Sequence, residues 1–136
     1  LGLLDGGAAL QLLVDRIRAT AARAGDISGE AAAQARHLLA AVDRLLEVTG
    51  RLAGSDDPAT TLAEATTYLE ALGHLVVGWL WLDQWLATGE QRTDFHEGKR
   101  AAARFFLTRE LPRVGPMLDL LDSGDRQLLD LDPATL

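Results

Sequence analysis

The stretch from Leu69 to Leu86 carries large apolar side chains on every side of a helix, and it constrains the fold more than any other segment. A helix at the surface of a globular protein has one apolar and one polar face, whereas a helix that is apolar all round must be enclosed. Its most apolar run covers only 75–82, far short of the roughly 20 residues that a membrane span needs. The sequence therefore predicts a central helix over about 58–88 that other helices surround.

Two earlier segments have the amphipathic pattern of helices that could surround the central one. Apolar residues recur at helical spacing over 7–24, with polar residues on the other side. In 29–53 the residues Leu38, Val42 and Leu45 share one face of a helix, and charged residues occupy the opposite arc. Both segments are therefore predicted to be helices with one buried face.

A fourth helix is predicted from Thr93, which can cap it, to about Leu121. Pro112 and Pro116 cannot donate backbone hydrogen bonds, so we expect this helix to be kinked there. The tail at 125–136 has enough leucine to pack onto the body of the protein.

The order of these segments indicates an all-α fold. No stretch shows the sustained period-two alternation of strands, and the turns between the helices are short. The economical arrangement is an antiparallel four-helix bundle with a kinked last long helix and a short tail. We expect 1–136 to form a single helical bundle domain, because one core suffices for a chain of this length.

Charge and composition exclude several classes of function. The 20 acidic residues against 13 basic ones give a formal net charge of -7, so the mean field repels nucleic-acid phosphates and anionic lipid headgroups. The chain has no cysteine, which removes disulfides and thiolate chemistry and fits a cytoplasmic protein. We therefore expect no nucleic acid among its partners and no membrane span.

The residues that could perform chemistry are scattered. Ser28, Ser55 and Ser123 all fall at predicted helix ends, where capping explains them, and no glycine pattern matches a phosphate-binding loop. Glu70 and His74 lie one helical turn apart, as half of a metal site would, but a di-metal bundle needs such pairs on several facing helices. We therefore predict no catalytic, cofactor-binding or metal-binding residue in this chain.

One strip of the central helix combines two tryptophans with polar groups. Its members are Glu70, His74, Trp81 and Trp85. Tryptophan is enriched in the energetic centres of protein interfaces, because it brings a large contact area and one hydrogen-bond donor. The strip is a candidate docking face for another domain or subunit. The alternative is that the rest of the bundle covers both indole rings.

Asp83 is a carboxylate on a largely apolar side of the same helix, near Leu72 and Trp79. Burying it without a partner would be costly. Lys99 and Arg109 border the apolar stripe of the fourth helix, so a pair with either is a candidate structural ion pair. The alternative is that the central helix is open to water at that turn.

Two stretches of sequence resemble a known family. They read ATTYLEALGHLVVGWLWLDQWLA at 65–87 and DFHEGKRAAARFFLTRELPRVGPMLDLL at 94–121, and both resemble the C-terminal helical extension of one branch of the acyl-CoA dehydrogenases. The segment DGGAALQLL near the start of the chain also resembles that branch. The sharpest pieces include Gly73-His74 and the run 103–106, which are packing signatures and not catalytic motifs.

The resemblance implies a larger flavoenzyme that binds FAD and oxidises an acyl-CoA thioester to the 2-enoyl-CoA. In that branch the glutamate that removes the α-proton stands, in a glutamate-glycine motif, just upstream of the region where this chain starts. The family's flavin-binding and acyl-CoA-binding segments have no match in this sequence. No site residue is therefore carried over. The resemblance implies a non-catalytic C-terminal domain that packs against other domains of its parent and a second subunit, and meets acyl-CoA only through that parent.

Other organisations of the protein share the same helical pattern. The chain starts at Leu1 without methionine and without the basic start of a signal peptide, from which we expect a piece of a longer polypeptide. The alternative is a free-standing helical protein-interaction module, which a complete short gene should encode. An enzyme or metal protein built in the bundle would need convergent ligands that the sequence does not offer.

Overall fold

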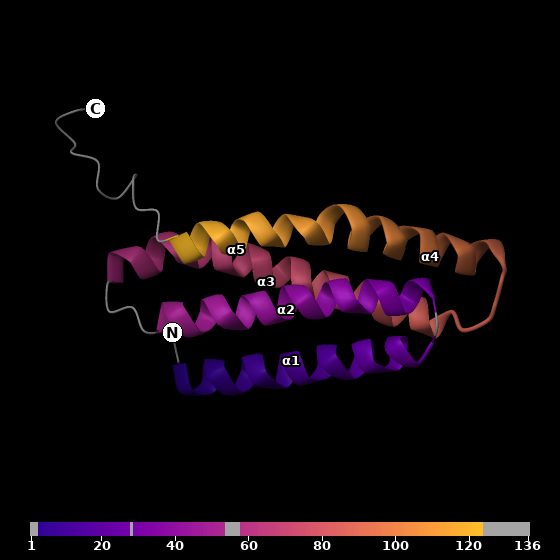
Figure 1. Ribbon diagram of the computed structural model, residues 1–136, viewed down its shortest axis with the longest axis horizontal. Helices are drawn as coiled ribbons and strands as arrows, with labels where there is room; N and C mark the ends of the chain where they lie inside the picture. The colour runs from indigo at the N-terminus through magenta and orange to yellow at the C-terminus, as the bar shows by residue number, and fades with distance from the viewer. Residues whose placement is uncertain (1–2, 28, 54–57, 124–136) are drawn as a thin grey trace, which may run out of the picture.

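The computed structural model describes residues 3–27, 29–53 and 58–123, and within these ranges its regular structure is entirely helical. Three segments are single helices, α1 (Leu3–Asp26), α2 (Glu30–Ala53) and α3 (Pro58–Ala87). The fourth is composite, with α4 (Asp94–Phe105), η1 (Phe106–Glu110), η2 (Leu111–Arg113) and α5 (Val114–Ser123). The four segments run antiparallel (Figure 1), which confirms the predicted all-α bundle. The predicted tail at 125–136 lies outside the described residues.

The helix bounds agree closely with the prediction, with the start of α1 as the main difference. It begins at Leu3, before the predicted start at residue 7, and so includes Gly6 and Gly7. A glycine inside a helix costs only about 1 kcal/mol relative to alanine, so these two residues do not end it. The predicted cap at Ser28 lies outside the described residues.

The apolar helix α3 is surrounded on several sides, as predicted. It packs against α2, against α1 and against the composite fourth segment, while α1 and α5 lie on opposite sides of the α2–α3 pair (Figure 1). Its residues Ala71, Leu75 and Leu82 are 0% exposed. The three neighbours therefore cover most of the circumference of α3, but one side of it faces outward.

The core is formed by aliphatic side chains from every segment. Its largest fully buried members include Val14 and Ile17 of α1, Leu38 and Leu45 of α2, Leu75 and Leu82 of α3, and Leu107 and Leu118 of the fourth segment. Burying such a side chain contributes about 1.5–3 kcal/mol relative to leaving it in water. One continuous cluster therefore holds the four segments together.

The helical ladder of the fourth segment changes pitch before Pro112. Residues 106–110 form a π-helical turn, in which the N–H of Leu111 donates to the carbonyl of Phe106. A 3-10 turn over 111–113 follows, and there the N–H of Val114 donates to the carbonyl of Leu111. Because proline has no N–H, the regular pattern cannot pass through this point. The distortion predicted here is confirmed, and it is spread over 106–113.

The turn between α3 and α4 is held by local hydrogen bonds. Gly89 ends α3 with a φ of 55°, a left-handed conformation that favours glycine. Thr93 caps α4, because its Oγ1 accepts from the N–H of His96 at 3.3 Å, as predicted. Arg100 is only 6% exposed and donates to the carbonyl of Gly89 at 3.1 Å. This arrangement fixes the direction in which α4 returns along α3.

Candidate functional site

The tryptophan strip of α3 faces α4 and η1. His74 Nε2 lies 3.7 Å from a carboxylate oxygen of Glu110, and the imidazole ring lies 6.1 Å from the ring of Phe106. Trp85 is only 9% exposed, and the guanidinium carbon of Arg104 lies 5.5 Å from its ring centroid. The chain itself therefore covers Trp85, which makes this ring an internal packing residue and not a docking residue.

The other members of the strip are more open to solvent. Trp81 is partly buried and packs against the core, while Glu70 is exposed. Glu70 also supports His74 through its backbone, because its carbonyl oxygen lies 3.1 Å from His74 Nδ1. Docking through Glu70 and Trp81 stays a prediction, whereas His74 and Trp85 are occupied by contacts within the bundle.

The cation beside Asp83 is Arg23 of α1. Arg23 Nη2 donates to the Asp83 carboxylate at 2.7 Å, and both side chains are about half exposed, at 62% and 47%. The predicted pair with Lys99 or Arg109 is therefore wrong, because Asp83 lies on the side of α3 that faces α1. Lys99 instead places its ammonium 5.4 Å from the ring centroid of Phe95. An exposed pair of this kind contributes about 0–1 kcal/mol.

A second ion pair was not foreseen from the sequence. Arg104 of α4 donates through Nη2 to a carboxylate oxygen of Glu30 at 3.2 Å, and through Nε to the other oxygen. The hydrogen bonds to Glu30 raise the pKa of Arg104. This two-point contact ties α4 to the first turn of α2, and it sits beside Trp85 because Arg104 also covers that ring.

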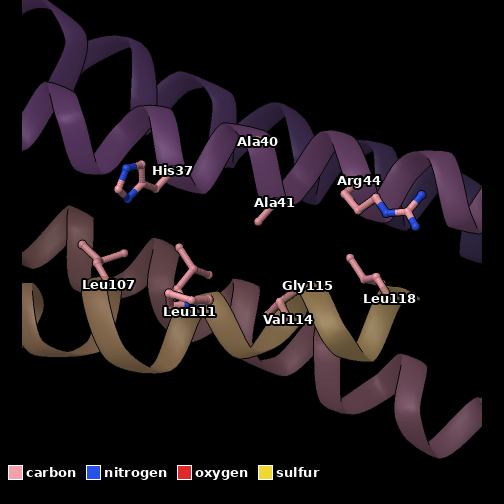
Figure 2. Close-up of a pocket in the computed structure, with 10 residues that line it drawn as sticks. His37, Ala40, Ala41, Arg44, Leu107, Leu111, Val114, Gly115 and Leu118 are labelled. Carbon is pink, nitrogen blue, oxygen red and sulfur yellow. The ribbon is translucent and has the colours of Figure 1, made fainter. Parts of the chain in front are cut away.

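A groove of about 340 Å³ lies between α2 and the fourth segment (Figure 2). One wall carries His37 and Arg44 of α2, and the other carries Leu107, Leu111, Val114 and Leu118. The groove exists because its base is made of small residues, Ala40 and Ala41 on one side and Gly115 on the other. The groove is therefore apolar except for the side chains of His37 and Arg44.

The cation in this groove is already neutralised. Arg44 Nη2 donates to Asp119 at 2.9 Å and to Asp122 at 3.1 Å, and its Nη1 lies 3.2 Å from Glu47. Arg51 donates to Asp122 and to Glu47 as well. Three carboxylates thus meet two guanidinium groups, so the local field does not attract an anionic ligand.

The pKa of Asp122 provides a test of this ion-pair cluster. The hydrogen bond from Arg51 has the largest effect and lowers that pKa below its usual value of 3.8. Burial opposes it, and the hydrogen bond from Arg44 lowers the pKa further. A lowered pKa means that the pair stabilises the fold fully above about pH 4, and that this contribution is lost as the pH falls through the folded-state pKa. Replacing Arg51 with glutamine should therefore raise the pKa of Asp122 toward 3.8.

Carbon-detected NMR titration of the carboxyl groups measures this pKa directly. Arg36→Gln is the matched control, because Arg36 lies on the exposed face of the same helix and does not contribute to the shift of Asp122. An unchanged Asp122 pKa in Arg51→Gln would contradict the assignment of Arg51 as the main cause.

One face of α3 is exposed and nearly free of charge. It consists of Leu69, Gly73, Val77 and Leu80, which lie three or four residues apart and so share one side of the helix. Leu69 is 64% exposed, Val77 40% and Leu80 48%. We call these four residues the outer strip. The sequence indicated that α3 has too many apolar side chains for one face, but not which of them would stay outside.

The described residues offer neither a cluster of metal ligands nor a membrane-spanning helix. Within 3–27, 29–53 and 58–123, no three histidine, aspartate or glutamate side chains are grouped as a metal ion would require. In the same ranges no helix combines the length and the apolar character needed to cross a bilayer.

The chain resembles known proteins over most of its length. Residues 13–132 match the family described as acetyl-CoA dehydrogenase C-terminal like. Over 123 residues the chain is 28% identical to a broad-specificity linear acyl-CoA dehydrogenase, FadE5, of Mycobacterium tuberculosis. That alignment covers 81% of this chain but 20% of the relative, so the chain spans about a fifth of the length of that protein.

Proposed function

Because the chain belongs to the acetyl-CoA dehydrogenase C-terminal-like family, which matches residues 13–132, we propose that it is the non-catalytic C-terminal helical domain of an FAD-dependent acyl-CoA dehydrogenase. In this proposal the parent enzyme oxidises acyl-CoA to 2-enoyl-CoA. The domain presented here serves the packing of domains and the assembly of subunits. The family match is the observation that carries the proposal.

The groove beside α2 does not suit FAD, which supports placing the cofactor in another part of the parent. A flavin dinucleotide brings a diphosphate that needs free cations or backbone N–H groups. The groove beside α2 offers Arg44, which already binds Asp119 and Asp122, and the nearby carboxylates outnumber the guanidinium groups. A diphosphate would be repelled there.

The geometry supports a mechanical role instead. His74, one of the two polar side chains on α3 that suggested chemistry, contacts Glu110 within the bundle. The bundle also presents an exposed, uncharged outer strip, and surfaces of this kind mark sites of protein association more often than sites of chemistry. A rigid helical body with such a strip is suited to steadying a larger assembly.

Three polypeptides test the proposal: the isolated chain, the complete polypeptide that contains it, and that polypeptide without it. We expect the isolated chain to be colourless and to oxidise no acyl-CoA with an artificial electron acceptor. The truncated polypeptide should keep flavin absorbance but lose subunit association or thermal stability, which sedimentation and calorimetry measure.

Two outcomes would refute the proposal. One is a tightly bound cofactor, or oxidation of acyl-CoA, in the isolated chain. The other is a truncated polypeptide whose assembly and stability equal those of the complete one. An open reading frame that holds only this chain would favour a free-standing interaction module.

A further inference from the structure

We propose that the outer strip of α3, Leu69, Gly73, Val77 and Leu80, docks onto an apolar helical surface in the catalytic part of the same polypeptide. The inference rests on the proposed function and adds to it the surface that makes the contact. The partner is an aliphatic surface that belongs to the chain to which the domain is joined.

Three of the eight large apolar side chains that are exposed among the described residues lie on this strip. Leu69 is 64% exposed, Val77 40% and Leu80 48%, although all three belong to a helix that packs against every other segment. A methyl group added at Gly73 would meet no atom within 4 Å outside its own helix segment, so the space above the middle of the strip is open. A partner can therefore approach the backbone of α3 closely at this point.

The strip differs in charge from the exposed face of the neighbouring helix. Between residues 66 and 87 the solvent side of α3 carries two charges, which lie at the edges of the strip: that of Glu70, and that of Asp83, whose half-exposed carboxylate is paired with Arg23. The exposed positions of α2, by contrast, include Glu30, Arg36, Asp43, Glu47 and Arg51. A protein with a net charge of -7 has ample charged residues for a solvent face, and α3 has almost none there. Depletion of charge is typical of the centre of an interface.

The area of the strip indicates which kind of partner it can hold. The strip runs over residues 69–80, which is about 18 Å along the helix axis, and at a width of about 10 Å it presents roughly 180 Å². A stable complex between free proteins of standard size buries about 800 Å² on each partner, so this strip alone is too small to hold a free second copy. A partner on the same polypeptide needs less area, because the connection raises its effective concentration to roughly the millimolar range.

The acyl-CoA dehydrogenase of Mycobacterium tuberculosis that this chain resembles is long enough to contain such a partner on the same polypeptide. The alignment covers 20% of that enzyme, so four-fifths of its length lie outside the part that this chain resembles. Under the proposed function, the remaining four-fifths include the flavin-binding part of the parent, so a partner joined to this chain is available there. That partner has to present aliphatic side chains to the strip, because the strip offers neither charge nor a row of donors.

Single cysteines report whether the strip is covered. The chain contains no cysteine, so Gly73→Cys places one thiol in the middle of the strip, and Gly50→Cys places one on the charged face of α2. Both sites have open space for a side chain, and a helix tolerates cysteine better than glycine. The rate of reaction with a maleimide is then measured in the complete polypeptide, after subtraction of the labelling of the unsubstituted protein.

We expect Gly73→Cys to react at least 10-fold more slowly than Gly50→Cys in the complete polypeptide, and both to react at similar rates in the isolated chain. Equal rates in a complete polypeptide that carries flavin would overturn the inference while leaving the proposed function intact. Protection in the isolated chain would also overturn it. If that protection disappears on dilution the cover is a second copy, and if it persists the cover is the chain's own residues.

A complete polypeptide without flavin would instead refute the proposed function. The strip inference would fall with it, because its partner would not exist. The absorbance spectrum therefore separates the two failures before any labelling is done.

Discussion

Replacing Leu82 with alanine is expected to lower the free energy of unfolding by about 2–5 kcal/mol. Leu82 is 0% exposed and belongs to the cluster in which α3 meets the other segments. The substitution removes three buried carbons and leaves a cavity that the surrounding helices fill only in part. Chemical denaturation followed by circular dichroism measures the loss.

Leu80→Ala is the matched control for this experiment. Leu80 lies two residues away on the same helix, is 48% exposed and belongs to the outer strip. The change in helix propensity is the same in both variants, so the difference between them isolates burial. We expect Leu80→Ala to change the free energy of unfolding by less than about 1 kcal/mol. Equal losses in the two variants would mean that α3 is not oriented as described.

The overall fold could be predicted because each helix has a period that the sequence displays. The alternation of core and surface positions in α2, with Leu38, Val42 and Leu45 buried, follows directly from a spacing of 3.6 residues. The apolar character of α3 likewise requires neighbours on several sides. The missing N–H of Pro112 predicted the distortion of the fourth segment, although a proline alone does not determine whether a π turn or a kink results.

The contacts between helices could not be predicted in the same way. Periodicity places Asp83 on one side of α3, but it does not say whether α1 or α4 packs against that side. The partner therefore proved to be Arg23, 60 residues earlier, and not Lys99 or Arg109. The contact of Arg104 with Glu30 joins residues 74 apart, and no local pattern connects them.

The tryptophan strip illustrates the same limit for the candidate site. The sequence placed Trp81 and Trp85 on one side of α3 and left open whether the bundle would cover them. The structure brings α4 against that side, so that Trp85 is buried beneath Arg104 while Trp81 is only partly covered. The apolar surface that stays exposed to solvent lies on the adjacent side of α3, at Leu69, Val77 and Leu80, because the three neighbouring segments leave that side uncovered.

Substitutions at Gly78 are expected to have the second large effect on the free energy of unfolding. Gly78 is the glycine of α3 that lies closest to the fourth segment. A methyl group at this position would lie 3.4 Å from Leu111 Cδ1, 3.6 Å from Leu107 Cδ2 and 3.6 Å from Leu38 Cδ1. These are ordinary van der Waals contacts. Gly78→Ala should therefore raise the free energy of unfolding by about 0.5–1 kcal/mol, since alanine favours the helix and fits the space.

Gly78→Leu should have the opposite effect and lower the free energy of unfolding by about 1–3 kcal/mol or more. The added carbons would have to occupy space that the three leucines fill, so α3 and the fourth segment would be forced apart. Gly73→Leu on the open side of the same helix is the control, and we expect it to be neutral or stabilising because nothing lies within 4 Å of the added methyl position. Thermal unfolding of the three variants gives the order of stability, with Gly78→Ala above Gly78→Leu and Gly73→Leu close to the unsubstituted chain. If Gly78→Leu were tolerated as well as Gly73→Leu, the close packing of α3 on η1 and η2 would be refuted, and with it the separation of a buried and an outer side of α3.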